Sequence, residues 1–337
     1  MDSEPPFEEA YNTLVLQSSL NTMKDDHKLD IYVGDCNLPL INLSHLSSHD
    51  QLERERCINE IAQAASNWGF FQVVNHGISV EVLESLEYEQ KNLFNQPFEK
   101  KIQSNFLNLP SNSYRWGNPK ATCLKQLSWS EAVHISITDA SAMSGSTECN
   151  NLRLTMERFA KAASDLVKTL VEILAQDLGV QFTYFQDNCP PNSSYLRMNR
   201  YPPCPYSSSK LVFGLIPHTD TDFLSVVYED QIGGLQLLKD GRWFRVKPNP
   251  EALVINIGDL FEALSNGVYK SVRHQVVATQ FERFSAAYFF CPSDESMVES
   301  YSQPGIYRKF SFKEYKQQNK KDVQDIGEKV GLQRFLL

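Results

Sequence analysis

The 337-residue chain has the composition of a globular protein with a sizeable core, since 42% of its residues are hydrophobic and 22% are charged. Its formal net charge of -9 argues against a non-specific nucleic-acid binder and against a protein that binds anionic membranes. The sequence contains no run of about 18 apolar residues, so we predict no transmembrane helix.

The seven cysteines form an odd set without C-x-x-C spacing, which favours reduced thiols over a disulfide framework or a zinc cluster. The N-terminal residues Met1–Pro6 lack the basic start and the apolar run of a secretion signal. The last four residues match no peroxisomal or lipidation signal. We therefore expect a cytoplasmic protein, with the nucleus as an additional location.

The first half of the chain is predicted to be mainly helical. Residues 1–36 are polar and weakly patterned, and we expect a partly flexible segment there. The elements predicted after it are a short strand at 38–43, a helix at 51–67, a strand at 68–74, a helix from 79 to about 96, and a long helix with an apolar stripe from 159 to 178. We assign residues 37–189 to this mainly helical region.

The texture changes after Pro190-Pro191 to short β-rich runs separated by Gly, Pro, Asp and Asn, as in a jelly-roll barrel. These runs are Tyr195–Tyr201, Phe223–Tyr228, Leu235–Leu238, Trp243–Val246, Leu253–Ile257, His274–Thr279 and Arg283–Phe290. We assign residues 190–295 to a jelly-roll core and residues 296–337 to a C-terminal helical segment.

The second half of the chain also carries a candidate metal site. Side chains at positions i and i+2 of an extended segment point to the same face, so His218 and Asp220 converge if this stretch is extended. With His274 from a neighbouring strand they would supply the two histidines and one carboxylate that are typical of non-haem Fe(II) sites. Taken alone, His218 could equally be a hydrogen-bonded core histidine. The ordered combination favours the metal site.

Arg283 and Ser285 follow His274 and would share one face of a strand, with Phe284, Ala286 and alternate residues on the other face. A guanidinium fork next to a hydroxyl is suited to bind a carboxylate. The motif therefore predicts a site for an acidic co-substrate beside the metal.

These motifs lie in blocks that resemble the plant 2-oxoglutarate- and Fe(II)-dependent dioxygenases. The blocks are Trp68–Ile78, Met198–Pro205, Gly214–Asp220, Gly233–Leu237, Val254–Asp259 and Ser271–Val276. The likeness runs from about Leu38 to Leu337 and so covers nearly the whole chain.

The resemblance implies an α+β fold, in which a distorted double-stranded β-helix (jelly-roll) core is wrapped by N-terminal and C-terminal helices. It implies Fe(II) on His218, Asp220 and His274. It implies that four residues bind 2-oxoglutarate, namely Arg283, Ser285, Tyr201 and Asn199. Arg283 is also expected to be a catalytic residue. Ascorbate is the expected reductant. The family motif Asn-x-Tyr often has Tyr at its middle position, where this chain has Arg200.

Within that family the chain is similar to the gibberellin 2-oxidases that act on twenty-carbon gibberellins, through Ser113–Pro119 and Gln126–Ala132. This implies O2-dependent hydroxylation at carbon 2 on the β face, with release of succinate and CO2. A gibberellin is a rigid apolar acid, so its pocket needs aromatic walls and a cation. The residues expected to contact it are Tyr114, Arg115, Trp116 and Trp129.

Several alternatives stay open. The four substrate candidates could instead pack their loop against the barrel, and we expect His76 and His134 to be structural and Trp68 and Phe70 to be core residues. The protein could act on another plant small molecule such as a flavonoid, or oxidise an amino-acid-derived ethylene precursor without 2-oxoglutarate. It could also be a catalytically silent hormone-binding relative. The sequence carries no signal for an oligomeric state.

Overall fold

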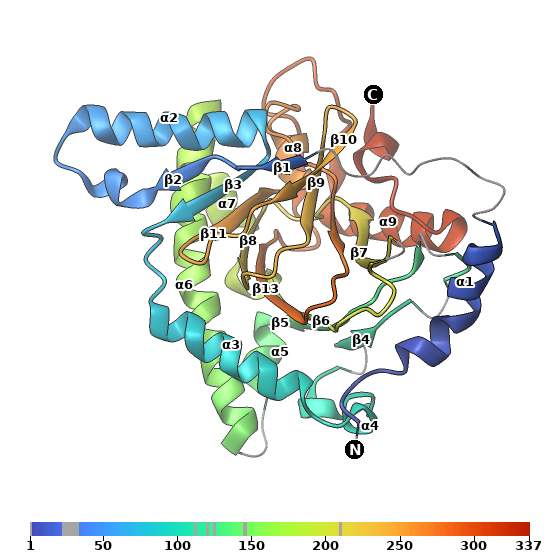
Figure 1. Ribbon diagram of the computed structural model, residues 1–337. Helices are drawn as coiled ribbons and strands as arrows, with labels where there is room; N and C mark the ends of the chain where they lie inside the picture. The colour runs from blue at the N-terminus through green and yellow to red at the C-terminus, as the bar shows by residue number, and fades with distance from the viewer. Residues whose placement is uncertain are drawn as a thin grey trace.

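The core of the protein, seen here as a computed structural model, is a pair of facing β-sheets surrounded by helices (Figure 1). The structure describes residues 2–21, 34–110, 113–118, 121–123, 126–143, 147–208 and 211–337. Its α-helices are α1 (Phe7–Asn21), α2 (Gln51–Asn67), α3 (Val80–Phe94), α4 (Phe98–Lys101), α5 (Ile137–Ala142), α6 (Thr147–Leu178), α7 (Thr183–Asn188), α8 (Asp259–Leu264) and α9 (Phe312–Ile326). Among the described residues, no helix is long and apolar enough to cross a membrane.

The larger sheet has eight strands in the order β2-β3-β11-β8-β13-β6-β5-β4, and the smaller has five in the order β1-β10-β9-β12-β7. The strands before residue 190 are β1 (Gly34–Cys36), β2 (Leu40–Asn42), β3 (Phe70–Val74), β4 (Tyr114–Trp116) and β5 (Glu131–Ser136). The later strands are β6 (Tyr195–Tyr201), β7 (Phe213–His218), β8 (Leu224–Glu229), β9 (Leu235–Lys239), β10 (Arg242–Val246), β11 (Leu253–Ile257), β12 (His274–Val277), β13 (Arg283–Phe290), β14 (Met297–Val298) and β15 (Phe310–Ser311). The predicted jelly-roll fold is confirmed, and strands from the first half of the chain extend both of its sheets.

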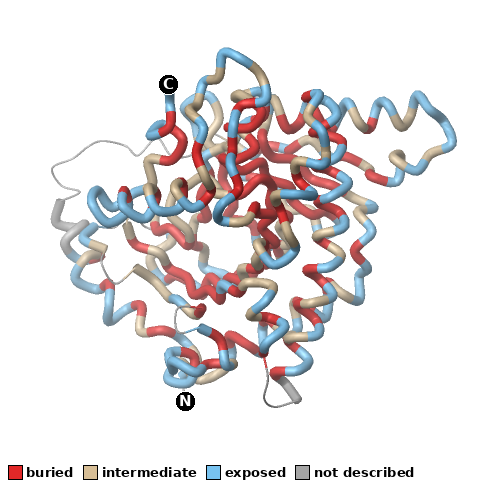
Figure 2. The backbone as a smooth tube through the Cα atoms, turned by 180° about the vertical axis from the view of Figure 1, so that it is seen from behind, coloured by how far each residue is buried: buried red, intermediate tan, exposed pale blue. Residues whose placement is uncertain are grey.

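The long helix α6 packs against strands β8 and β13 of the larger sheet, and helices α2 and α3 pack against α6 (Figure 1). Its apolar stripe, which includes Phe159, Leu170 and Leu174, is completely buried. Burying such a stripe against a sheet supplies most of the stability of an amphipathic helix. Figure 2 shows that buried residues concentrate in the strands and on the inner sides of these helices.

The N-terminal helix α1 lies within residues 1–36, where no helix was predicted. Phe7, Tyr11 and Val15 recur at intervals of four and are all buried. Phe7 stacks on Trp129 with a distance of 4.8 Å between the ring centroids. The helical spacing of these three residues was a signal in the sequence that the polar residues between them obscured. Residues 22–33 of the predicted segment lie outside the described residues.

A buried ionic cluster fastens β5 to its surroundings. Glu131 and Lys101 have fully buried side chains, and Lys101 Nζ donates a hydrogen bond of 2.6 Å to Glu131 Oε2. The other Glu131 oxygen accepts a bond of 2.8 Å from Arg200, which also pairs with Glu4 and Glu282. Arg200, the departure from the family pattern, therefore anchors the N-terminal segment and β5 to β6.

Replacing Glu131 by glutamine is expected to lower the free energy of unfolding by about 3–5 kcal/mol, because it leaves buried cations without their counter-charge. Denaturant unfolding followed by circular dichroism measures this change. The matched control is Asp165→Asn in the exposed pair Lys161–Asp165, where a change of at most about 1 kcal/mol is expected. Similar small losses in both variants would contradict the assignment of a stabilising role to the cluster.

Candidate metal centre and co-substrate site

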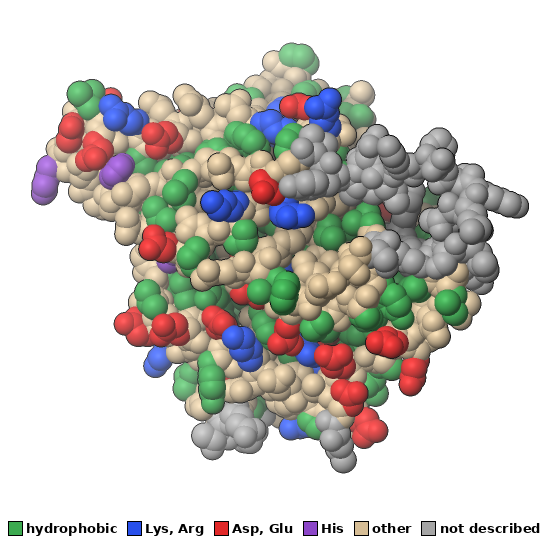
Figure 3. All heavy atoms as spheres, in the orientation of Figure 1, with side chains coloured by type: hydrophobic (Ala, Val, Ile, Leu, Met, Phe, Trp, Pro, Cys, Tyr) green, Lys and Arg blue, Asp and Glu red, His purple; other side chains and the backbone are tan. Residues whose placement is uncertain are grey.

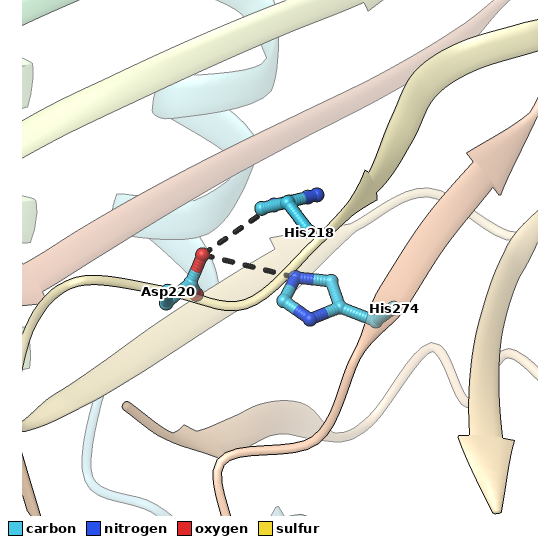
Figure 4. Close-up of side chains that lie close together, drawn as sticks. All are labelled: His218, Asp220 and His274. Carbon is cyan, nitrogen blue, oxygen red and sulfur yellow. Dashed lines mark ion pairs between the residues drawn. The ribbon is translucent and has the colours of Figure 1, made fainter. Parts of the chain in front are cut away.

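The predicted metal ligands meet where strands β7 and β12 pair. The two strands are antiparallel, and their register sets His274 directly opposite His218. Asp220 lies two residues beyond the end of β7, outside the strand itself. Its Oδ1 lies 3.5 Å from His218 Nε2 and 3.8 Å from His274 Nε2, as Figure 4 shows. The candidate ligand atoms of the three residues all lie within 4.8 Å of one another.

Hydrogen bonds orient each of the three side chains. The Nδ1 atoms of His218 and His274 lie 2.8 and 3.0 Å from the backbone carbonyl oxygens of Ile216 and Val272. This arrangement favours the tautomer in which Nε2 carries the lone pair that faces Asp220. Asp220 Oδ2 accepts bonds from nearby side chains, namely Asn256 at 2.5 Å and Ser225 at 3.1 Å. Its Oδ1 is left to face the histidines.

The protonation states also suit a cation. Burial lowers the pKa of His274 to about 4, and the neighbouring His218 adds to this shift, so the His274 imidazole is neutral at pH 7. Burial acts to raise the pKa of Asp220, but the two histidines outweigh it and the pKa lies below its usual range. A neutral imidazole and an ionised carboxylate are the forms in which these side chains bind metals. The donor set therefore fits Fe(II).

The predicted co-substrate residues meet on two paired strands. In the antiparallel pair of β13 and β6, Arg283 lies opposite Tyr201 and Ser285 lies opposite Asn199. The guanidinium of Arg283 lies 4.8 Å from the centre of the Tyr201 ring. Asn199 Nδ2 donates a hydrogen bond of 3.3 Å to Ser285 Oγ. Gly214 makes room for this arrangement, because a Cβ atom there would lie 2.5 Å from Tyr201 Cδ1.

The guanidinium of Arg283 has N–H donors that form no hydrogen bond with the described residues. The residue is 3% exposed, and its Nη2 forms a buried ion pair of 2.5 Å with Glu229. Its Nε and Nη1 are buried and have no hydrogen-bond partner. Buried donors of this kind are costly unless a ligand satisfies them. A carboxylate of 2-oxoglutarate fits this requirement.

Both groups of residues line one cavity of about 440 Å³ between the two sheets. Its apolar wall is made by Phe70, Leu215, Val227, Leu235 and Val276. Phe70, predicted to be a core residue, is buried and also lies edge-on to His274, with 5.1 Å between the ring centroids. The cavity is therefore a largely apolar chamber with polar groups at defined points, as is usual for small-molecule sites.

Only Arg115 of the four residues predicted to contact the substrate lines this cavity. Side chains alternate along β4, so its neighbours Tyr114 and Trp116 point to the other side of the sheet. The Tyr114 hydroxyl donates a hydrogen bond of 2.5 Å to Glu131. Trp116 packs edge-on against Phe7 and Phe98.

Trp129 is 3% exposed beneath helix α1, where it stacks on Phe7. Together with Tyr114 and Trp116 it serves packing, which was the alternative considered from the sequence. The structure therefore places Tyr114, Trp116 and Trp129 outside the lining of this cavity.

The two histidines predicted to be structural differ in their places. His76 Nδ1 accepts a hydrogen bond of 3.2 Å from the backbone N–H of Ile78, as expected for a turn residue. His134 instead lines the cavity, together with Arg197 and Tyr195. The alternation of side chains along β6 could have predicted that Arg197 and Tyr195 face the cavity, because residues 195, 197, 199 and 201 share one face of the strand. His134 itself could not be placed without the register of β5.

Comparison with known proteins agrees with the site. Residues 192–292 match the 2OG-Fe(II) oxygenase superfamily, and residues 38–153 match the N-terminal region named for a non-haem dioxygenase in morphine synthesis. Gibberellin 2-beta-dioxygenase 8 of Arabidopsis thaliana is 49% identical to the chain, over 99% of this chain and 98% of the relative. Gibberellin 2-beta-dioxygenase 6 of Oryza sativa subsp. japonica is 45% identical, over 89% of this chain and 85% of the relative.

Among solved structures, JOX2 in complex with 2OG, Fe and JA aligns with a TM-score of 0.75 and 26% identity, over 92% of this chain and 91% of that one. The dioxygenase for auxin oxidation in rice aligns with a TM-score of 0.72 and 26% identity, over 89% of this chain and all of that one. The chain belongs to the 2OG-Fe(II) oxygenase superfamily. It is an Fe(II)- and 2-oxoglutarate-dependent dioxygenase.

Proposed function

We propose that this dioxygenase hydroxylates gibberellins at carbon 2 on the β face, acts on twenty-carbon gibberellins, and thereby inactivates them. The observation that carries the proposal is the end-to-end similarity to gibberellin 2-beta-dioxygenases, at 49% and 44% identity for two Arabidopsis thaliana relatives. The cavity supports it, because it combines apolar walls with cationic side chains, as a rigid apolar acid requires. We place the reaction in the cytoplasm.

In this proposal His218, Asp220 and His274 hold Fe(II), which supplies the redox chemistry that activates O2 when 2-oxoglutarate is bound. Arg283 binds the distal carboxylate of 2-oxoglutarate through its two unsatisfied donors. Ser285 and Tyr201 add hydrogen bonds, and Asn199 fixes the Ser285 hydroxyl. The apolar wall orients the gibberellin ring system and excludes water from the reacting C–H bond. Ascorbate keeps the iron reduced.

A panel of substrates tests the proposal. Purified protein is incubated in air with Fe(II), ascorbate and 2-oxoglutarate, together with a twenty-carbon gibberellin, a nineteen-carbon gibberellin or a flavanone, and products are identified by mass spectrometry. We expect a 2-hydroxylated twenty-carbon gibberellin and succinate in equal amounts. Hydroxylation of the flavanone alone would overturn the gibberellin assignment while leaving the oxygenase intact.

A further inference from the structure

One wall of the cavity is made by two neighbouring rows of side chains that run across strands β13, β6, β5 and β4. On β6, Arg197 occupies the same face as Asn199, and its register partners are Ala287 on β13 and His134 on β5. On β4, Arg115 lies opposite Ala132, which in turn lies opposite Asn199. The two rows therefore bring two guanidinium groups and one imidazole to the cavity wall beside the 2-oxoglutarate residues.

Arg197 differs from the other buried or partly buried arginines of this sheet in its partners. Arg200 pairs with three glutamates and Arg283 pairs with Glu229. Arg197 Nε instead donates to the neutral side chain of Asn199, at 2.8 Å, and no carboxylate of a described residue forms an ion pair with it. A guanidinium that faces a largely apolar cavity without a counter-charge is costly unless an anion binds there.

His134 lies beside the two arginines, and their positive charges affect its pKa. Partial removal from solvent, together with the charges of Arg197 and Arg115, lowers the pKa of His134 to about 4. Its ring packs on Tyr195 with 4.2 Å between the centroids. His134 is therefore neutral at pH 7 and can donate a hydrogen bond without adding a third charge. Acidic side chains spread across the lower half of the face in Figure 3, and the overall charge is -9, so the two arginines of the cavity wall belong to an otherwise acidic protein.

We propose that Arg197 and Arg115 form the subsite that binds a carboxylate of the substrate and so determine its selectivity for acids. The proposal rests on the proposed function and deepens it, because gibberellins are carboxylic acids. Two arginines suit a carboxylate better than a hydroxyl or a ketone, since their forked N–H groups match its two oxygens. An ester or a neutral flavonoid would leave the partly buried Arg197 guanidinium without a counter-charge in the cavity, so we expect the cavity to disfavour it.

The subsite is connected to the 2-oxoglutarate site through Asn199. Because Asn199 Oδ1 accepts from Arg197, its Nδ2 group is directed at Ser285, to which it donates. The substrate anchor and the co-substrate hydroxyl are thus held by the two ends of one amide.

Steady-state kinetics with a twenty-carbon gibberellin and with its methyl ester test the subsite in the full-length enzyme. For Arg197→Gln we expect the KM for the acid to rise about 10- to 100-fold, the range of a lost charge-assisted interaction. Turnover of the ester should change much less than turnover of the acid, and Arg197→Lys should restore part of the preference for the acid. Arg153→Gln on helix α6, which removes a partly buried arginine outside the cavity, is the matched control.

Equal effects of Arg197→Gln on acid and ester, or no effect on either, would overturn the subsite. If the wild-type enzyme processes no gibberellin, the proposed function fails and the subsite is tested by binding alone. For this we would titrate abietic acid and its methyl ester into the Co(II)- and 2-oxoglutarate-loaded protein by calorimetry. The subsite predicts that the wild type binds the acid about tenfold or more tightly than the ester, and that Arg197→Gln removes this preference. Equal binding of the two, or no binding of the acid, would contradict it.

Discussion

Replacement of His218 or Asp220 by alanine is expected to abolish turnover of 2-oxoglutarate, while the protein stays folded. Each substitution removes one of three ligands whose donor atoms lie within 4.8 Å of one another, and two ligands do not hold Fe(II) at working concentrations. Succinate formation measures turnover, iron content measured after gel filtration reports binding, and thermal unfolding reports the fold. We expect loss of both iron and succinate.

The matched control is His76→Ala, which removes a histidine that caps a turn outside the cavity. This variant should keep its iron and most of its activity. Normal activity in His218→Ala or Asp220→Ala at normal iron content would remove these residues from the metal site.

Arg283→Lys is expected to raise the KM for 2-oxoglutarate about 10- to 100-fold, because a lysine keeps the positive charge but loses the planar fork. The conservative variant is needed because of Glu229. Arg283→Ala would leave that carboxylate buried and unpaired, and would cost about 3–5 kcal/mol of stability in addition to co-substrate binding. Kinetics with varied 2-oxoglutarate, at saturating Fe(II), measure the effect.

Arg153→Gln again serves as the control and should leave the 2-oxoglutarate dependence unchanged. An unaltered KM in a folded Arg283→Lys variant would assign the co-substrate carboxylate to another residue. A loss of iron binding in this variant, with normal co-substrate affinity, would place Arg283 in support of the metal centre instead.

The sequence predicted those parts of the site that depend on short-range geometry. The i, i+2 rule placed Arg283 and Ser285 on one face of β13, and the structure has both of them on the cavity wall. Most of the later strands also appear where β-branched and aromatic runs occur. Strand β7 was not among the predicted runs, because Gly214 and Pro217 interrupt its pattern. Gly214 is required there by the adjacent Tyr201 ring.

Residues whose roles depend on distant partners could not be predicted. Tyr114 was interpreted as a substrate contact, but its hydroxyl meets Glu131, which also holds Lys101 and Arg200. Trp129 was interpreted as a pocket wall, but helix α1 covers it through Phe7. Aromatic residues on a short segment bury their surface against whichever element the fold brings close. Only the register of β4 with β5 shows that Arg115 alone faces the cavity.

The origin of the oxygen atoms in the products tests the central claim most directly. We would run the reaction under ¹⁸O2 with 2-oxoglutarate and a twenty-carbon gibberellin, and measure both products by mass spectrometry. A 2-oxoglutarate-dependent dioxygenase places one labelled atom in succinate and label in the new hydroxyl group, with the two products in equal amounts. Unlabelled succinate, or a hydroxylated gibberellin formed without 2-oxoglutarate, would contradict the account.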